Sequence, residues 1–148
     1  MRKSLVLSLG LIAALAVSAC APSGSGISPN NAVIRITDSA MKMKVDYTVA
    51  PSGKITFLVF NQDTVDHEVV ILKTDTAPEK LALLSSASKV DEDGVGENVG
   101  ELEVEAGATG AATFDLGPGK YVLICNVLSH YMAGMYSAFE VKAAAVGQ

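Results

Sequence analysis

From residue 33 onward, apolar and polar side chains alternate along much of this chain, and this alternation constrains its fold more than any other feature. In "VIRIT", the isoleucines at 34 and 36 are separated by polar residues. Successive side chains of a β-strand point to opposite faces, so a period of two predicts strands with one buried face. "KITFLVF" at 54–60 and "HEVVILK" at 67–73 have the same strand-like composition. The chain is therefore expected to consist mainly of β-strands.

Turn residues divide this region into about eight short strands. They are expected at residues 33–37, 44–49, 54–60, 67–73, 101–105, 111–116, 120–125 and 136–142. Turns are predicted at "PSG" (51–53) and "GPG" (117–119), and "APEKLALLSS" at 77–86 predicts one short helix. A chain of 148 residues with this pattern is expected to form one domain, an all-β Greek-key β-sandwich with a short helical insertion.

The first twenty residues carry the pattern of an export signal. Arg2 and Lys3 precede an apolar run from Leu5 to Val17, and "VSAC" ends at Cys20. The run is shorter than the roughly 20 residues that a membrane span needs, which favours a cleaved signal. "VSAC" resembles a bacterial lipobox, which would make Cys20 the lipidated first residue of the mature protein. An ordinary signal peptide with an incidental Cys20 is the alternative.

The lipobox interpretation divides the chain into a lipoprotein signal peptide at 1–19, lipidated Cys20 with a flexible tether at 20–32, and a domain at 33–148. It places the domain outside the cytoplasm, lipid-anchored to a bacterial membrane on the periplasmic or cell-surface side. It also leaves Cys125, the second of two cysteines, without a disulfide partner. A lone thiol in an oxidising compartment is expected to be buried or bound.

Charge and composition exclude nucleic acid as a partner. The formal net charge is −5, and it becomes −7 when Arg2 and Lys3 leave with the signal peptide. Nucleic-acid binding needs a basic surface, and base stacking needs aromatic residues, which make up only 5% of this chain. An acidic domain favours a basic protein partner, mainly by steering its approach. The acids that could do so are Asp91, Glu92, Asp93, Glu97, Glu101, Glu103 and Glu105.

Four residues with metal-binding side chains stand at suggestive spacings. Cys125, His130 and Met135 follow one another at intervals of five, and His67 begins an expected strand. A mononuclear electron-transfer copper site uses two imidazoles, a thiolate and a weak axial thioether. The chain has two histidines in total, which is the number that one such site needs. Taken singly, each residue also has an ordinary explanation: a buried thiol, a surface histidine or a packing methionine.

The segments "GKYVLICNVLSHYMAGMYSAFEV" and "VFNQDTVDHEVVI" resemble the copper-binding regions of the cupredoxins, the blue-copper group that includes plastocyanin, azurin and auracyanin. The resemblance extends over Val33–Lys142. It implies one type 1 copper ion as the cofactor. It implies as ligands His67, Cys125, His130 and Met135. Met132 is a rival axial ligand, but Met135 has the matching position.

The chain departs from the family pattern at two places without losing a ligand. Leu128 and Ser129 stand where many members have Pro-Gly, and Glu68 stands where many have asparagine after the first histidine. That asparagine supplies a hydrogen bond around the ligands, which tunes a metal site. Asn126, next to Cys125, is a candidate for the same role.

The resemblance implies a membrane-anchored one-electron carrier that cycles between Cu(I) and Cu(II). Its partners would be a donor and an acceptor redox protein. The expected electron port is the edge of His130, surrounded by Val127, Leu128, Tyr131 and Met132, because small apolar faces suit brief encounters.

A copper chaperone or copper buffer is the alternative function. Met41 and Met43 form an M-x-M that could bind Cu(I) if both residues shared a strand face, although packing beside Val45 explains them as well. A copper enzyme is not expected, because the chain has no further histidines to bind additional copper ions. We therefore expect neither catalysis nor a small-molecule substrate.

Overall fold

The computed structural model describes residues 31–85 and 87–144. Cys20, the expected signal peptide and nearly all of the expected tether lie outside these residues. The first strand begins at Asn31, two residues before the expected start of the domain. No helix in the described part of the chain has both the length and the apolar character needed to cross a membrane.

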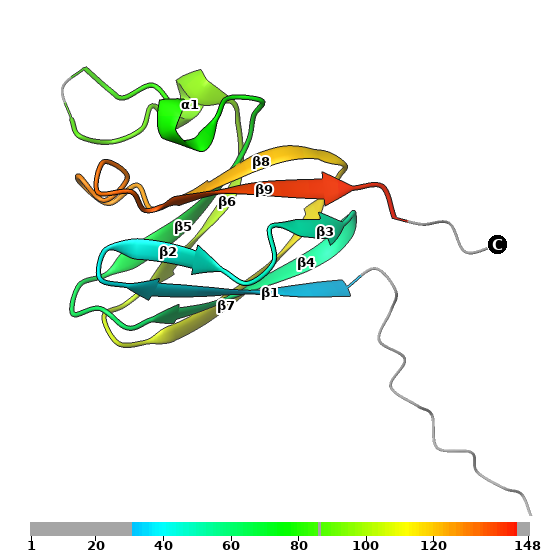
Figure 1. The fold of residues 1–148 in the computed structure, drawn as a ribbon, viewed down its shortest axis with the longest axis horizontal. Helices are drawn as coiled ribbons and strands as arrows, with labels where there is room; N and C mark the ends of the chain where they lie inside the picture. Colours follow the sequence, from blue (N-terminus) through cyan, green and yellow to red (C-terminus); the bar gives the residue numbers. More distant parts are fainter. Residues whose placement is uncertain (1–30, 86, 145–148) are drawn as a thin grey trace, which may run out of the picture.

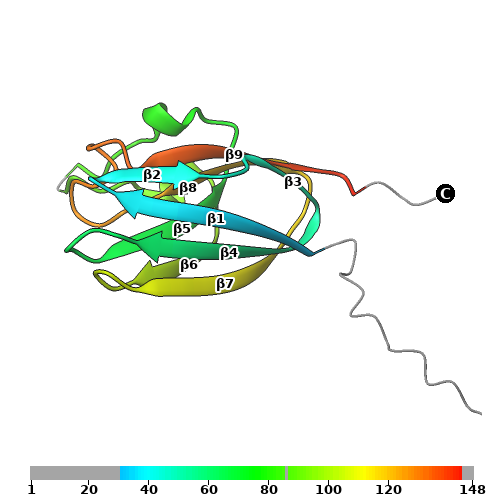
Figure 2. The same cartoon turned by 60° about the horizontal axis from the view of Figure 1, so that its bottom comes forward.

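Two β-sheets face each other (Figures 1 and 2). The four-stranded sheet has the order β2-β1-β4-β7. Its strands are β1 Asn31–Ser39, β2 Lys42–Val45, β4 Gly53–Asn61 and β7 Thr109–Leu116. The five-stranded sheet has the order β3-β9-β8-β5-β6. Its strands are β3 Val49–Pro51, β5 His67–Lys73, β6 Glu97–Val104, β8 Gly119–Ile124 and β9 Tyr136–Lys142. The all-β sandwich predicted from the alternation is confirmed.

The described residues contain nine strands because the expected strand at 44–49 is divided in two. Val45 pairs with Ile36 in one sheet, whereas Val49 pairs with Glu140 in the other. The chain crosses between the sheets here, and the side chain of Tyr47 is 64% exposed. An alternating pattern predicts an extended local backbone, but it contains no information about which sheet the strand joins.

The helical insertion is shorter than the leucines at 81–84 suggested. A 3-10 helix, η1, spans Pro78–Lys80, and Leu83 and Leu84 beyond it are exposed. A second helical turn, α1 at Glu92–Val95, lies between the predicted helix and the strand expected at 101–105. The carboxylate of Asp91 accepts a hydrogen bond from the backbone N–H of Gly94 and so caps this turn.

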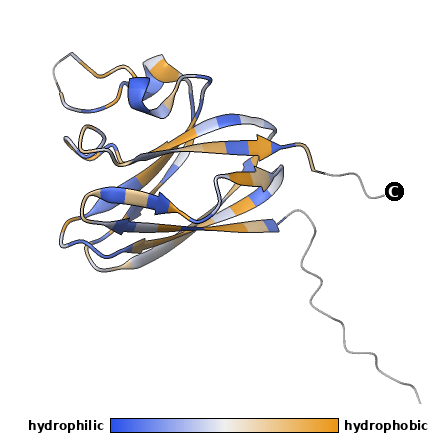
Figure 3. Ribbon diagram, viewed as in Figure 1, coloured by the Kyte–Doolittle hydropathy of each residue, from blue (hydrophilic) through white to orange (hydrophobic). Residues whose placement is uncertain are grey.

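β5 and β8 are buried on both faces. Their inward side chains join the main core between the sheets, which includes Phe57, Leu123 and Phe139. Their outward side chains form a second core that the segments around Leu81 and Val90 cover. Figure 3 shows the resulting apolar stretches along these strands. Burial on both faces explains why "VVIL" and "YVLI" read as continuous apolar runs.

Candidate metal centre

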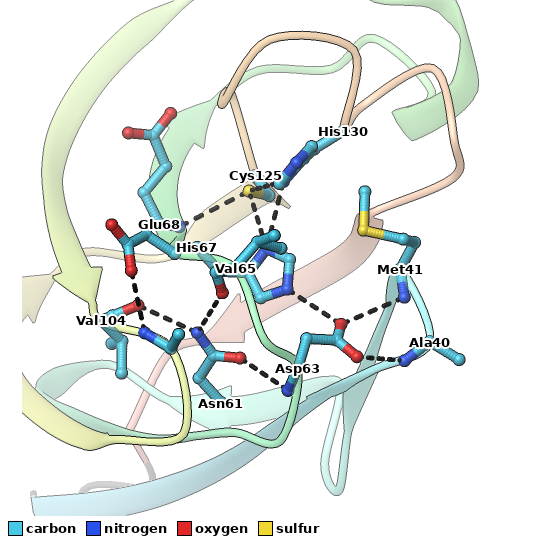
Figure 4. Close-up of polar contacts among 12 residues, drawn as sticks. Ala40, Met41, Asn61, Asp63, Val65, His67, Glu68, Val104, Cys125 and His130 are labelled. Atoms are coloured by element: carbon cyan, nitrogen blue, oxygen red, sulfur yellow. Dashed lines mark hydrogen bonds and ion pairs between the residues drawn. The ribbon is translucent and has the colours of Figure 1, made fainter.

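The side chains of His67, Cys125 and His130 converge at one end of the sandwich (Figure 4). The Sγ atom of Cys125 lies 3.3 Å from Nδ1 of His130 and 3.7 Å from Nδ1 of His67. The two Nδ1 atoms are 3.1 Å apart. His67 and Cys125 are 1% and 0% exposed, and His130 is 9% exposed. The thiol and the two imidazoles therefore lie together in a position that is almost completely shielded from solvent.

Strand parity explains why two of these side chains point inward. Cys125 follows Tyr121 and Leu123 at intervals of two, and all three belong to the core between the sheets. His67 has the same relation to Val69 and Ile71 on β5. Because β5 pairs with β8 in the sheet, the two inward positions lie beside each other.

His130 comes from the tight loop that joins β8 to β9. The backbone N–H of His130 donates to the carbonyl of Val127, and the N–H of Met135 donates to the carbonyl of His130. The N–H of Cys125 donates to the carbonyl of Met135 and so closes the loop. Ser129 has a φ of +71°, the left-handed conformation that glycine adopts readily. Glycine would adopt this conformation at position 129 with less strain than the serine of this chain.

The backbone bonds of Met135 hold it against both Cys125 and His130. Its side chain is fully buried and belongs to the same core as Cys125. Met132, the rival axial candidate, is 61% exposed. The environment therefore favours Met135 as the thioether donor.

The spacing of the three donors fits one metal ion. A trigonal ion at about 2.0–2.1 Å from nitrogen and about 2.3 Å from sulfur sets its donors roughly 3.5–3.8 Å apart. The three separations in the structure, 3.1, 3.3 and 3.7 Å, lie close to this arrangement. Two imidazoles and a thiolate with a nearby thioether are the donor set of a blue-copper site.

Burial controls the protonation of the metal-free donors. It raises the pKa of the Cys125 thiol. The backbone N–H of Glu68 donates a hydrogen bond to Sγ at 3.5 Å, and this bond acts in the opposite direction. Burial also lowers the pKa of His130, and the neighbouring His67 adds to this effect. The resting site thus holds a neutral thiol and a neutral His130 imidazole, and a metal ion that binds the sulfur must displace the thiol proton.

Asn126 holds the ligand loop against the segment around Val90. Its Oδ1 accepts from the Val90 N–H at 2.6 Å, and its Nδ2 donates to the Val90 carbonyl at 3.1 Å and to Glu92 Oε1 at 2.6 Å. Glu68 contacts the site through its backbone N–H. Burial raises the pKa of its half-buried carboxyl.

Tyr131 faces the interior and not the surface around His130. It is 5% exposed, its hydroxyl donates to the carbonyl of Pro78 at 2.6 Å, and the N–H of Leu81 donates to it at 3.0 Å. Its expected place in the electron port is therefore wrong, because the covering segment at 78–81 binds it. Leu128 and Met132 are each 61% exposed, and Val127 is partly buried.

We expect Tyr131→Phe to lower the free energy of unfolding by about 1–3 kcal/mol, because it leaves two buried backbone groups without their partner. Urea denaturation of the metal-free protein measures this loss. Tyr47→Phe is the control, since Tyr47 is 64% exposed, and it should change stability by less than about 0.5 kcal/mol. Equal stabilities for both variants would contradict a structural role for the Tyr131 hydroxyl.

Met41 and Met43 do not share a strand face. Met43 lies in β2 and is 8% exposed, whereas Met41 lies in the β1–β2 turn with a φ of +58°. Met43 packs in the main core, and Met41 is partly buried against it. The packing explanation of this pair is the one that the structure favours.

Two aspartates near the site have roles that the sequence pattern did not indicate. Asp63, in the turn after β4, lies with Oδ2 3.0 Å from Nε2 of His67. Asp38, on the inward face of β1, is 0% exposed, and neither of its carboxylate oxygens has a hydrogen-bond partner among the described residues. Burial raises the pKa of Asp38 to about 6. The spacing of Asp63 four residues before His67 is the one signal that could have indicated a contact between them.

A family model for the sulfocyanin (SoxE) domain matches residues 23–146. A comparison with curated protein sequences gives no match. Among solved structures, reduced auracyanin from Roseiflexus castenholzii is 21% identical, with a TM-score of 0.53, over 76% of this chain and 97% of that one. Auracyanin A, a "blue" copper protein from Chloroflexus aurantiacus, is 19% identical, with a TM-score of 0.53, over 76% and 99%. Reduced rusticyanin is 17% identical, with a TM-score of 0.54, over 76% and 80%.

The structural likenesses show a shared fold, and the family match covers most of the chain. The two-sheet sandwich and the cluster of two histidines and a cysteine agree with that match. The chain belongs to the sulfocyanin (SoxE) domain family, and it is a cupredoxin.

Proposed function

We propose that this protein is a one-electron carrier with a single type 1 copper ion bound by His67, Cys125, His130 and Met135. The observation that carries the proposal is the convergence of one Sγ and two Nδ1 atoms within 4.8 Å in a buried position. Auracyanin A, which has the same fold, is described as a "blue" copper protein. The protein acts as a carrier and not as an enzyme.

The copper ion supplies a one-electron couple, and the residues around it set the conditions for transfer. The soft thiolate suits Cu(I), the two imidazoles retain Cu(II), and the weak axial thioether tunes the balance between the two states. His67 lies on β5, and the other donors lie on the β8–β9 segment that backbone hydrogen bonds of Cys125, His130 and Met135 close. A frame of this kind limits rearrangement when the electron arrives. Near-complete burial of the donors also keeps water away from the site.

The edge of His130 is the proposed electron port. His130 has the largest exposed fraction of the three clustered donors, 9%, and it lies on the loop that carries exposed Leu128 and Met132. A small apolar surface of this kind suits a transient complex. Exposed acids on β6 support a partner with basic charge. They are Glu97, Glu101 and Glu103, with Glu105 just beyond the strand. Asp91 and Glu92 are bound within the fold, by Gly94 and by Asn98 and Asn126.

Membrane anchoring through lipidated Cys20, outside the cytoplasm, is part of the proposal. It is supported by the export pattern at the N-terminus. β1 begins at the end of the sandwich away from the β8–β9 loop (Figure 1). An anchor joined to that end would leave His130 free to meet a partner.

The test is to load the metal-free domain with Cu(II) and record its visible and EPR spectra and its voltammogram. We expect an intense visible band, a single copper signal and a reversible one-electron wave. A colourless Cu(I) complex that passes its metal to another protein would contradict the carrier function and indicate copper trafficking. Substrate turnover by the purified domain would contradict the absence of catalysis.

Met135→Leu should retain the colour and raise the reduction potential, because loss of a weak axial donor destabilises Cu(II) more than Cu(I). Voltammetry of the copper-loaded variant measures the shift. Met132→Leu is the matched control, since Met132 is exposed, and its potential should equal that of the wild type. If Met132→Leu shifted the potential and Met135→Leu did not, Met132 would be the axial ligand.

A further inference from the structure

We propose that Asp63 is a positioning residue for the copper ligand His67: it fixes the ring with Nδ1 toward the metal and lowers the reduction potential of the site. The inference rests on the proposed function, because it assumes copper at Nδ1 of His67. It concerns a residue outside the ligand set, in the turn between β4 and β5.

The first step is the contact between the two side chains. Oδ2 of Asp63 lies 3.0 Å from Nε2 of His67, whose side chain is fully buried. A carboxylate is an acceptor, so Nε2 carries the proton and donates it. Nδ1 of the same ring faces Cys125 and His130, so in this tautomer its lone pair points into the donor cluster (Figure 4). A ligand histidine whose second nitrogen donates to a carboxylate is oriented and made more basic.

The second step is that the Asp63 carboxylate is itself held in place. Its Oδ1 accepts from the N–H of Ala40 at 2.7 Å, and its Oδ2 accepts from the N–H of Met41 at 3.2 Å. Ala40 and Met41 form the β1–β2 turn with φ values of +52° and +58°. In this conformation both of their N–H groups reach the carboxylate. The turn thus links His67 to the opposite sheet.

A buried amide fixes the backbone of Asp63 as well. The N–H of Asp63 donates to Oδ1 of Asn61, which is 2% exposed. Nδ2 of Asn61 donates to the carbonyls of Val65 at 2.8 Å and Val104 at 3.1 Å. The carboxylate is therefore positioned before any metal binds.

The third step concerns charge. The carboxylate accepts hydrogen bonds from Nε2–H of His67 and from the N–H groups of Ala40 and Met41, and three donors facing one carboxyl group suit its ionised, acceptor-only form. A carboxylate that accepts a hydrogen bond from Nε2–H increases the electron density at Nδ1 of the same ring. Because Cu(II) gains more than Cu(I) from a stronger nitrogen donor, the carboxylate favours the oxidised state.

Asp66 provides a matched control in the same turn. It is also an aspartate close to His67 in sequence, but it is exposed, and its Oδ1 accepts from the N–H of Ala106 at 2.9 Å. Asp66→Asn removes the same charge and leaves the His67 ring untouched. The comparison separates a specific hydrogen bond from the general field of an acidic surface.

The experiment measures the reduction potentials of copper-loaded wild type, Asp63→Asn, Asp63→Ala and Asp66→Asn at one pH and ionic strength. We expect both Asp63 variants to shift the equilibrium at least tenfold toward Cu(I), which raises the potential by 59 mV or more for a one-electron couple. Asp66→Asn should shift it less than threefold. Equal shifts for Asp63→Asn and Asp66→Asn, or no shift in either, would overturn the proposal.

A measurement on the wild type covers the case in which the Asp63 variants fail to fold. Nitrogen-15 NMR of the metal-free protein should show the proton of His67 on Nε2, and a proton on Nδ1 alone would overturn the proposal. The two hypotheses fail differently. A wild type that forms no blue-copper site contradicts the proposed function, whereas a blue wild type whose potential ignores Asp63 contradicts this inference alone.

Discussion

Cys125→Ser should abolish the intense visible absorption of the copper-loaded protein. That absorption arises from charge transfer between a thiolate and Cu(II), and a serine hydroxyl cannot supply it. Cys125 is 0% exposed and Ser has nearly the same size, so the sandwich should remain folded. The remaining two imidazoles and thioether should bind copper more weakly, and EPR should show an ordinary cupric signal. Visible and EPR spectra of the copper-loaded variant measure both effects.

Two comparisons make this result interpretable. Far-UV circular dichroism of Cys125→Ser should match that of the wild type, which excludes unfolding as the cause. Met132→Leu should keep the full colour, because Met132 is exposed at the rim of the site. Unchanged colour in Cys125→Ser would show that this sulfur does not bind the metal.

Asp38→Asn should stabilise the metal-free protein by up to about 3 kcal/mol at neutral pH. Burial raises the pKa of Asp38 from 3.8 to about 6, and one pKa unit corresponds to about 1.36 kcal/mol. Asparagine has the same shape and never ionises. The ionised carboxylate of the wild type, by contrast, is buried without a hydrogen-bond partner among the described residues.

The sign of the pH dependence follows from the raised pKa. Below pH 3.8, Asp38 is protonated in both the folded and unfolded states, so it costs no stability. Between pH 3.8 and about 6 the unfolded chain loses this proton first, and folding becomes progressively less favourable. The advantage of Asp38→Asn should therefore grow over this range and stay constant above it.

Urea denaturation of the metal-free protein at several pH values measures this advantage. Asp75→Asn is the control: its side chain is 91% exposed in a surface ion pair with Lys120, so the change should be within about 0.5 kcal/mol at every pH. A constant effect of Asp38→Asn across the range would contradict ionisation of Asp38 as its cause.

Much of the fold follows from local patterns because strands bury every second residue. The alternation at 54–60 corresponds to β4, whose inward residues Ile55, Phe57 and Val59 are all 0% exposed. The same period of two explains why Cys125 and His67 lie on the inward face, in line with Leu123 and Val69. It failed where the chain changes sheet near Tyr47, because periodicity contains no information about which strand is the neighbour.

The prediction of a helix at 77–86 was wrong in its extent for a related reason. Leu81, Leu83 and Leu84 gave an apolar run that favoured a helix, but only Leu81 is buried. The segment instead follows the outer face of β5 and β8 and provides the groups that bind Tyr131. Its conformation is decided by the surface that it covers, and that surface comes from strands distant in sequence.

The sequence by itself determined the kinds of donor available, their spacing on the β8–β9 loop and the inward face of each flanking strand. These properties depend on residue type and on a period of two, which are local. Only the tertiary structure decided that Asp63 meets the far nitrogen of His67, that Asp38 is buried with no hydrogen-bond partner in the described part of the chain, and that Tyr131 turns inward. These contacts join residues through the register of the strands and the packing of one sheet on the other, and neither is encoded in any single stretch of the chain.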